Sequence, residues 1–151
     1  MINFSSILKV SNAAVDVDSR TKDDALSFAV DLACKSGAVP NRDKLLVEIR
    51  ARETLSSTGI GEGVAVPHAL CDSITQTVLS VVRLARPIDF AAVDSKPVDL
   101  IFLMAGPRGD TANHLKILSK LARLLHDADF RNAARAAKDS EALVHLLLGK
   151  D

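Results

Sequence analysis

Residues 59–68 read GIGEGVAVPH, which is three glycines, an apolar run, a proline and a histidine. The apolar run Val64–Val66 predicts a short buried strand. Pro67 has a fixed φ and keeps the residue before it extended, so we expect His68 to be presented at a strand end in a defined direction. Glycines let backbone N–H groups approach an anion closely. A histidine beside such a backbone is a candidate nucleophile for phosphoryl transfer, and the alternative is a structural histidine bonded to a neighbouring carbonyl.

Strand patterns occupy the middle of the chain, and helix patterns lie on both sides of them. The run Thr75–Leu84 predicts a strand, and the almost wholly apolar run Val98–Ala105 predicts a strand that is buried on both faces. Residues Leu55–Gly63 predict a loop. This order predicts one α/β domain over residues 1–151, built around a layered sheet. Helices are predicted over Asp23–Ser36, from the Asn41 cap to about Thr54, and over Thr111–Asp127, Phe130–Lys138 and Asp139–Leu148.

The composition argues against several classes of protein. Hydrophobic residues make up 48% of the chain but aromatic residues only 3%, so the core must be largely aliphatic. Lys plus Arg and Asp plus Glu each number 19, and this zero net charge argues against a dedicated nucleic-acid-binding protein. No apolar stretch approaches the roughly 20 residues that span a bilayer, and Met1–Val10 lacks the pattern of a signal peptide. Cys34 and Cys71 form no CxxC motif and predict reduced thiols in a cytoplasmic protein.

Two further residues are candidates for a phosphoryl site. His114 is in line with Leu118, Leu121 and Leu125 on a predicted helix, so it should point toward the sheet. It also lies in the first turn, where the helix dipole disfavours its protonation and attracts phosphate. Arg52 ends the helix before the glycine segment, and its guanidinium offers a fork of donors suited to phosphate. The alternatives are a satisfied core histidine and a solvated charge at a helix C-terminus.

Other chemistries find little support in the sequence. His126 lies at a predicted helix C-terminus, and His145 follows Glu141 by four residues, so both are interpreted as structural or surface residues. No HxH, HExxH or Cys/His cluster occurs, and we therefore expect no metal site. The glycines form neither a P-loop nor a dinucleotide-binding fingerprint, and no GxSxG motif is present. We expect no cofactor.

The motifs together resemble a known family, the EIIA domains of the fructose/mannitol type in the bacterial phosphotransferase system. The resemblance covers nearly the whole chain. The STGIG sequence of Ser57–Gly61 and the stand-alone length are most similar to the nitrogen-regulatory branch of that family. The residues that carry the resemblance are Arg52-Glu53, Ser57–Gly61, Gly63–His68, Pro87–Phe90, Asp94, Pro97–Phe102, His114-Leu115, Phe130-Arg131 and Ser140–Leu143.

The resemblance implies a fold and a site. The fold would be an α/β sandwich with a mixed sheet between helices. His68 would be the phosphorylated residue, with His114 and Arg52 as its neighbours. We expect Nε2 to react, with Nδ1 held by a backbone carbonyl, because the hydrogen bond of one ring nitrogen decides which nitrogen is free. The donor would be a phosphohistidine carrier of the NPr or HPr kind, and no metal would be needed. Ala69-Leu70-Cys71 departs from the glycine and basic residue that follow the histidine in many relatives, which puts the docking surface in doubt. Loop N–H groups would stabilise the phosphoryl oxygens, and the candidates are Thr58, Gly59, Gly61 and Gly63.

Three functions remain open from the sequence. A regulator would use its phosphorylation state to choose target proteins, such as transporters or kinases. A sugar-transport EIIA would instead pass the phosphoryl group to an EIIB domain. A binding module that has lost phosphotransfer is the third, and the joint presence of His68, His114 and Arg52 argues against it. We expect the regulator, which is a phosphotransferase-system component more than a turnover enzyme, with no nucleic-acid partner and no membrane insertion.

Overall fold

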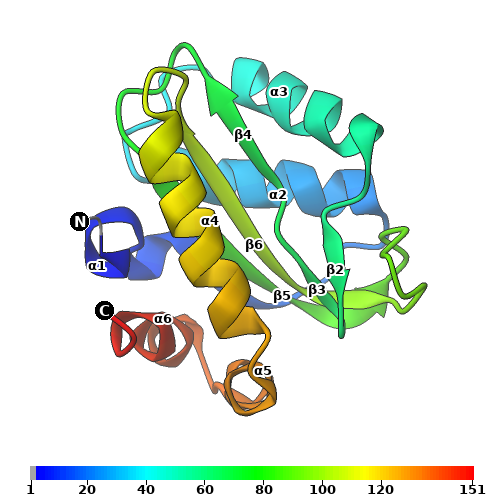
Figure 1. Cartoon of the computed structure of the whole chain (residues 1–151). Helices are drawn as coiled ribbons and strands as arrows, with labels where there is room; N and C mark the ends of the chain where they lie inside the picture. The colour runs from blue at the N-terminus through cyan, green and yellow to red at the C-terminus, as the bar shows by residue number, and fades with distance from the viewer. Residues whose placement is uncertain (1–2) are drawn as a thin grey trace.

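The computed structural model describes residues 3–151, and its centre is a six-stranded mixed sheet (Figure 1). The strands follow the order β1-β5-β6-β3-β2, and β4 also pairs with β6. Strands β5 and β6 are antiparallel, whereas β1 runs parallel to β5, and β3 and β4 run parallel to β6. The bounds are β1 Ala13–Val17, β2 Gly59–Gly61, β3 Val64–Ala65, β4 His68–Cys71, β5 Val78–Ile88 and β6 Val98–Pro107.

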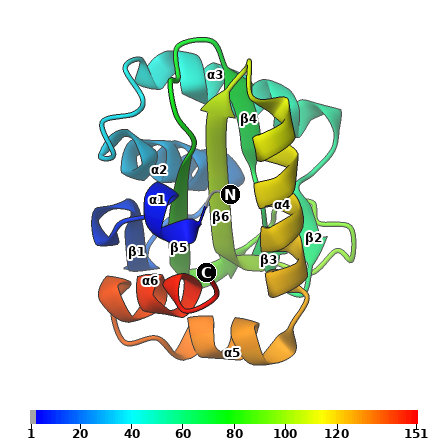
Figure 2. The same cartoon turned by 60° about the vertical axis from the view of Figure 1, so that its left-hand side comes forward.

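Helices cover both faces of the sheet (Figures 1 and 2). One core lies between the sheet and helices α2 and α3, and the other lies between the sheet and α1, α4, α5 and α6. Across the part of the chain that the structure describes, no helix is both long and apolar enough to cross a bilayer. The helices are α1 Phe4–Ile7, α2 Lys22–Cys34, α3 Arg42–Leu55, α4 Thr111–Leu125, α5 Ala128–Ala136 and α6 Ser140–Leu148, with a short 3₁₀ turn at Val10–Asn12.

Strand β6 explains why one stretch of sequence is apolar without alternation. Its residues point alternately to the two sides of the sheet. Ile101 and Leu103 therefore pack in the core under α2 and α3, and Phe102 and Met104 pack in the core under α4. The prediction that Val98–Ala105 forms a strand buried on both faces is confirmed, because all but one of its residues are buried.

The long periodic segments are helices and strands as predicted, and the short segments differ. Asn41 caps α3 by accepting a hydrogen bond from the Lys44 N–H. The prediction of an unbroken loop over Leu55–Gly63 is wrong, because Gly59–Gly61 pairs with β3 as strand β2. His68 begins strand β4 instead of ending a strand. The physical reason is that Pro67 lacks only its own N–H donor. Its carbonyl still accepts the Met104 N–H, so the chain continues beside β6 and His68 can begin a new strand there.

Candidate functional site

His68 is the first residue of β4, and its imidazole is oriented by a backbone carbonyl. Its Nδ1 lies 2.8 Å from the carbonyl oxygen of Val66. A carbonyl can only accept a hydrogen bond, so Nδ1 carries a proton. In the neutral imidazole, this contact therefore selects the tautomer whose lone pair is on Nε2. His68 is half-buried, and alternation along β4 places it on the side of the sheet opposite Ala69 and Cys71, which pack toward α3.

His114 lies in the first turn of α4 and faces His68. The centroids of the two imidazole rings are 5.7 Å apart, and the ring planes are inclined by 52°. His114 is 5% exposed, and its Nδ1 is buried without a hydrogen-bond partner among residues 3–151. Burial, and secondarily the charge of His68, lowers the pKa of His114 from 6.5 to about 4. The imidazole is therefore neutral at pH 7, and burial is the main cause.

Arg52 completes a group of three predicted residues around one pocket. The pocket has a volume of about 500 Å³, and His68, His114 and Arg52 all line it. Helix α3 contributes one wall, α4 contributes the opposite wall, and β4 lies between them. One guanidinium nitrogen of Arg52, Nη1, donates to the Ser56 carbonyl over 2.9 Å. A guanidinium has five N–H donors, so others remain for a ligand.

The rim of this pocket is apolar. Leu55 at the end of α3 is 80% exposed, and Leu115 on α4 is 58% exposed. Leu70, which is half-buried, lies on β4 between them. Two exposed leucines and one half-buried leucine therefore form an apolar rim on three neighbouring elements, and such apolar patches are typical of sites of protein interaction.

The four predicted loop residues lie outside the pocket. Gly61 and Gly63 have φ values of +104° and +79°. Gly61 is the last residue of β2, and Gly63 lies in the turn between β2 and β3. A Cβ at Gly61 would contact Asp94, and one at Gly63 would clash with Arg135. Backbone conformation and the space left by neighbouring side chains therefore explain why glycine occupies both positions, without a bound phosphate.

Thr58 and Gly59, the other two loop residues, are held by neighbours that are not part of the pocket. Thr58 is buried, and both its N–H and its hydroxyl donate to the Glu53 carboxylate. A Cβ at Gly59 would lie 2.7 Å from the Cβ of Ala92, so the glycine permits a close approach of two segments. Gly59 also donates its N–H to the hydroxyl of Ser57 over 3.1 Å.

Two charged residues, one lining the pocket and one behind it, were given no role by the sequence pattern. Arg108 lines the pocket and bridges Asp72, at 2.9 Å, to Glu48, at 3.3 Å. Its signal in the sequence is only a single arginine in the turn before α4. Glu53 is buried beside Lys22, and this could have been found, since Glu53 continues the buried stripe of α3 by steps of four residues.

The remaining histidines and the cysteines lie apart from the pocket. His126 caps the C-terminus of α4, His145 lies on α6, and both are exposed. Cys34 is a half-buried free thiol on α2, and Cys71 is a buried free thiol on β4. Within the described residues, no three His, Cys, Asp or Glu side chains gather closely enough to hold a metal ion.

Comparison with known proteins gives consistent matches across the chain. The family model for the phosphoenolpyruvate-dependent sugar phosphotransferase system, EIIA 2, matches residues 6–150. A nitrogen regulatory protein of Bradyrhizobium diazoefficiens is 39% identical over 119 residues, which are 78% of each chain. The fructose-specific EIIA component of the PTS system of Haloferax volcanii is 33% identical over 145 residues, which cover 96% of this chain and 94% of that one.

A solved structure matches the fold as well. The nitrogen regulatory protein IIA-Ntr from Neisseria meningitidis superposes with a TM-score of 0.89 at 31% identity, covering 94% of this chain and 97% of that chain. The matched family region contains α3, β4 and α4, which together form the pocket.

Proposed function

Because the chain belongs to the type-2 EIIA family of the phosphoenolpyruvate-dependent sugar phosphotransferase system, we propose that it carries the phosphoryl group on His68. One observation carries the choice of residue. His68 has its Nδ1 occupied by the Val66 carbonyl, and it shares a pocket with a neutral histidine and an arginine. This is a nucleophile with a free Nε2 beside two groups that stabilise phosphoryl oxygens.

The proposed transfer needs only the groups in this pocket. Nε2 of His68 attacks the phosphorus of a phosphohistidine on the donor carrier, in line with the P–N bond that breaks. The new P–N bond forms at Nε2, and the donor imidazole takes the electron pair of the old bond. The Val66 carbonyl stabilises the Nδ1–H of the modified ring. Positioning and electrostatic stabilisation supply most of the catalysis in such transfers.

His114 and Arg52 have distinct proposed roles. The Nδ1 of His114 is buried without a partner among the described residues, which favours the tautomer with its proton on Nε2, since an unpaired buried N–H is costlier than an unpaired lone pair. A neutral His114 then donates one hydrogen bond from Nε2 to the phosphoryl group. Arg52 supplies the positive charge from the opposite wall. Removal of one such donor typically costs about 3 kcal/mol of transition-state stabilisation.

For the output of the phosphorylated protein we propose regulation. Its support is the likeness to nitrogen regulatory proteins from two different bacteria. The phosphorylated form would bind its target proteins differently from the unmodified form, and the donor would be a carrier of the NPr or HPr kind. Sugar transport is the second candidate, and the likeness to a fructose-specific EIIA component supports it.

The test of the phosphorylation site uses purified donor proteins. Enzyme I, an HPr or NPr carrier and phosphoenolpyruvate should place one phosphoryl group on each wild-type chain, and the linkage should be acid-labile and alkali-stable. His68→Ala should accept none. The exposed His126→Ala is the matched control and should be phosphorylated like the wild type. A full phosphoryl group on His68→Ala would refute the assignment, and an unmodified wild type would favour the binding module.

A further inference from the structure

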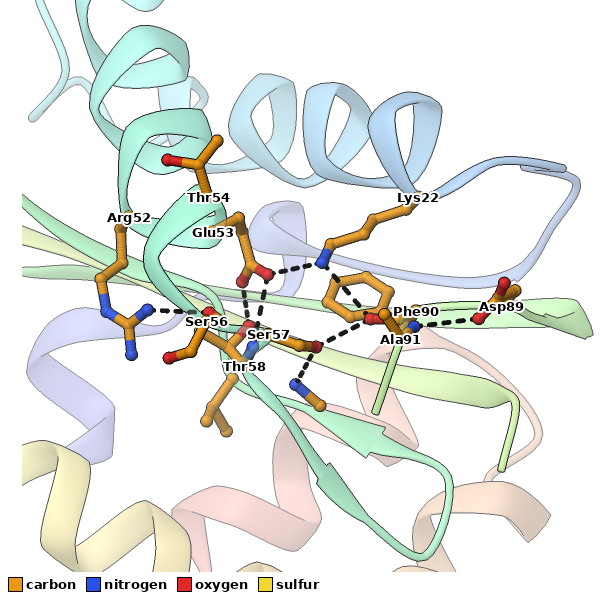
Figure 3. Close-up of polar contacts among 12 residues, drawn as sticks. Lys22, Arg52, Glu53, Thr54, Ser56, Ser57, Thr58, Asp89, Phe90 and Ala91 are labelled. Atoms are coloured by element: carbon orange, nitrogen blue, oxygen red, sulfur yellow. Dashed lines mark hydrogen bonds and ion pairs between the residues drawn. The ribbon is translucent and has the colours of Figure 1, made fainter. Parts of the chain in front are cut away.

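Glu53 is a buried carboxylate near the C-terminal end of α3, and three donor groups from two residues contact it. Its side chain is only 5% exposed. Lys22 of α2 approaches it with a distance of 2.8 Å between Nζ and Oε2. The Thr58 N–H donates to Oε2 over 3.3 Å, and the Thr58 hydroxyl donates to Oε1. Figure 3 shows the Glu53 carboxylate between Lys22 and Thr58, with the side chain of Arg52 directed to the other side of the helix.

The contacts continue from Glu53 to the ring of His68. The carbonyl of Thr58, whose N–H Glu53 holds, accepts the Val66 N–H over 3.0 Å. The carbonyl of Val66 in turn accepts the Nδ1–H of His68 over 2.8 Å. One residue, Thr58, therefore connects the Glu53 carboxylate by hydrogen bonds to Val66, whose carbonyl sets the His68 tautomer.

The same segment is also fixed at its neighbouring residues. The Ser57 hydroxyl donates to the Phe90 carbonyl over 2.7 Å, and Lys22 donates to that carbonyl over 3.3 Å. Lys22 also lies over the Phe90 ring, 4.6 Å from its centroid. Ser56, one residue earlier, accepts the bond from Arg52. The residues between α3 and β2 thus connect Glu53 and Lys22 to Arg52 (Figure 3), and Thr58 connects them to Val66, next to Pro67 and His68.

We propose that Glu53 is a positioning residue for phosphoryl transfer, which holds Thr58 so that the Val66 carbonyl fixes the orientation and tautomer of His68. The inference rests on the proposed function of His68. Stability alone explains the buried charge poorly, because well-packed apolar side chains stabilise a protein as well as a buried ion pair does. Hydrogen bonds from three donors instead define where the segment lies, as the residues that support a catalytic group must do.

The variant Glu53→Gln keeps the shape of the side chain and removes what the inference requires. Glutamine has one acceptor oxygen, and its NH₂ group would face Lys22 or the donors of Thr58. We expect the maximal rate of transfer from phosphorylated HPr-type carrier to fall by at least about tenfold. The carrier concentration for half-maximal rate should stay as in the wild type, since Glu53 is buried. ¹⁵N NMR of the histidines should show a larger fraction of His68 with its proton on Nε2.

The matched control is Asp23→Asn. Asp23 also joins α2 to α3, because Arg50 donates two hydrogen bonds to it, of 2.7 and 2.8 Å. These bonds do not involve Glu53, Thr58 or Val66, which connect the cluster to His68. Its variant should keep the wild-type rate and tautomer. Thr58→Val, which removes one donor to Glu53, should change the rate and the tautomer in the direction of Glu53→Gln, by less, and it serves as the test should Glu53→Gln not fold.

The outcomes separate this inference from the proposed function. Suppose that the wild type is phosphorylated on His68, and that Glu53→Gln and Thr58→Val both fold and match the control in rate and tautomer. This result would overturn the role of Glu53 and leave the proposed function of His68 intact. Should Glu53→Gln not fold, a Thr58→Val protein that matches the control would overturn it equally. Wild type that is not phosphorylated on His68 would instead refute the proposed function.

Discussion

At the scale of the residue, the surroundings of His114 constrain its charge. The centroids of the His68 and His114 rings are 5.7 Å apart, and the inner ring, that of His114, is removed from water. Protonation of His114 would place a positive charge in a poorly solvated position and close to the His68 ring. Burial is the larger of these two effects, and both lower the pKa of His114. A neutral inner ring leaves His68 free to act as a nucleophile without a competing charge beside the incoming phosphoryl group.

The first prediction at this scale concerns pH and stability. The pKa of His114 is about 4 in the folded protein and 6.5 in the unfolded chain, so the unfolded chain binds the proton between these values. Stability is therefore lost as pH falls from about 6.5 toward 4. At pH 5 the loss due to this group should be on the order of 2 kcal/mol relative to pH 7 or above. Urea unfolding of wild type and His114→Asn at both pH values measures it.

Other titrating groups are common to the two proteins in this comparison. Their contributions largely cancel when the acid-induced loss of wild type is set against that of His114→Asn. The wild type should lose more stability on acidification. Equal losses in both proteins would show that His114 is not buried in the neutral form.

The sequence predicted which residues belong to the site where a local pattern was enough to single them out. His114 stood out because it heads an apolar stripe at helical spacing, and it is buried. Glu53 lies on the same kind of stripe, but its burial was not predicted, because a glutamate is rarely buried. Arg108 could not be found, because a single arginine in a turn carries no periodic signal, and its pairing with Glu48 and Asp72 arises only from the fold.

At the scale of the element, the β2–β3 hairpin shows how one sequence signal serves two structural needs. Glycines permit both close approach to an anion and backbone with positive φ, and the sequence alone does not distinguish them. In the structure Gly61 and Gly63 have positive φ at the hairpin turn, and Gly63 leaves room for Arg135. Short strands were likewise missed, since β1, β2 and β4 have too few residues to show a period and are formed by pairing with distant segments.

A second prediction tests the hairpin. In Gly63→Ala the new Cβ would lie 2.5 Å from Nη2 of Arg135, at a φ of +79°. Arg135 would have to leave its bonds to Glu62 and Asp99, so we expect a loss of about 1–3 kcal/mol in the free energy of unfolding. The phosphorylation rate of the folded protein should stay within about twofold of wild type, because a donor to the phosphoryl group would cost about a hundredfold if lost.

Gly109 provides the control for this prediction, since a Cβ there would meet no atom within 4 Å and its φ is not positive. Gly109→Ala should unfold close to the wild type. A slow transfer in a well-folded Gly63→Ala protein would restore the role of this glycine in phosphate binding.

At the scale of the whole molecule, the fold joins residues that the sequence keeps far apart. Helix α3 packs on one face of the sheet and α4 on the other, and they meet around β4. Arg52, His68 and His114 reach one pocket by this arrangement. The sequence predicted each of the three as a candidate by its local pattern and by family resemblance. Their common pocket, with leucines from three elements on its rim, depends on sheet order, which local patterns do not encode.

The last prediction follows from that rim and separates a regulator from a sugar carrier. Phosphorylation adds nearly two negative charges beside Leu55, Leu70 and Leu115 on a chain of zero net charge. A partner that buries this rim should bind the unmodified protein and be released on phosphorylation, because the charge would have to be desolvated. A partner that presents Arg or Lys should show the opposite preference. Pull-downs with wild type, phosphorylated wild type and His68→Ala measure this, with His68→Ala matching the unmodified wild type.

The parallel assay mixes phosphorylated protein with donor proteins and membranes that contain the fructose- or mannitol-specific components. For a regulator we expect no sugar phosphorylation above that of His68→Ala, because the phosphoryl group ends on a protein whose role is to bind targets. Leu70 gives the docking rim an apolar residue close to His68, so the partner of this rim need not be a sugar-specific component. Efficient phosphorylation of either sugar, together with identical partners in all three samples, would leave sugar transport as the function that His68 and its apolar rim serve.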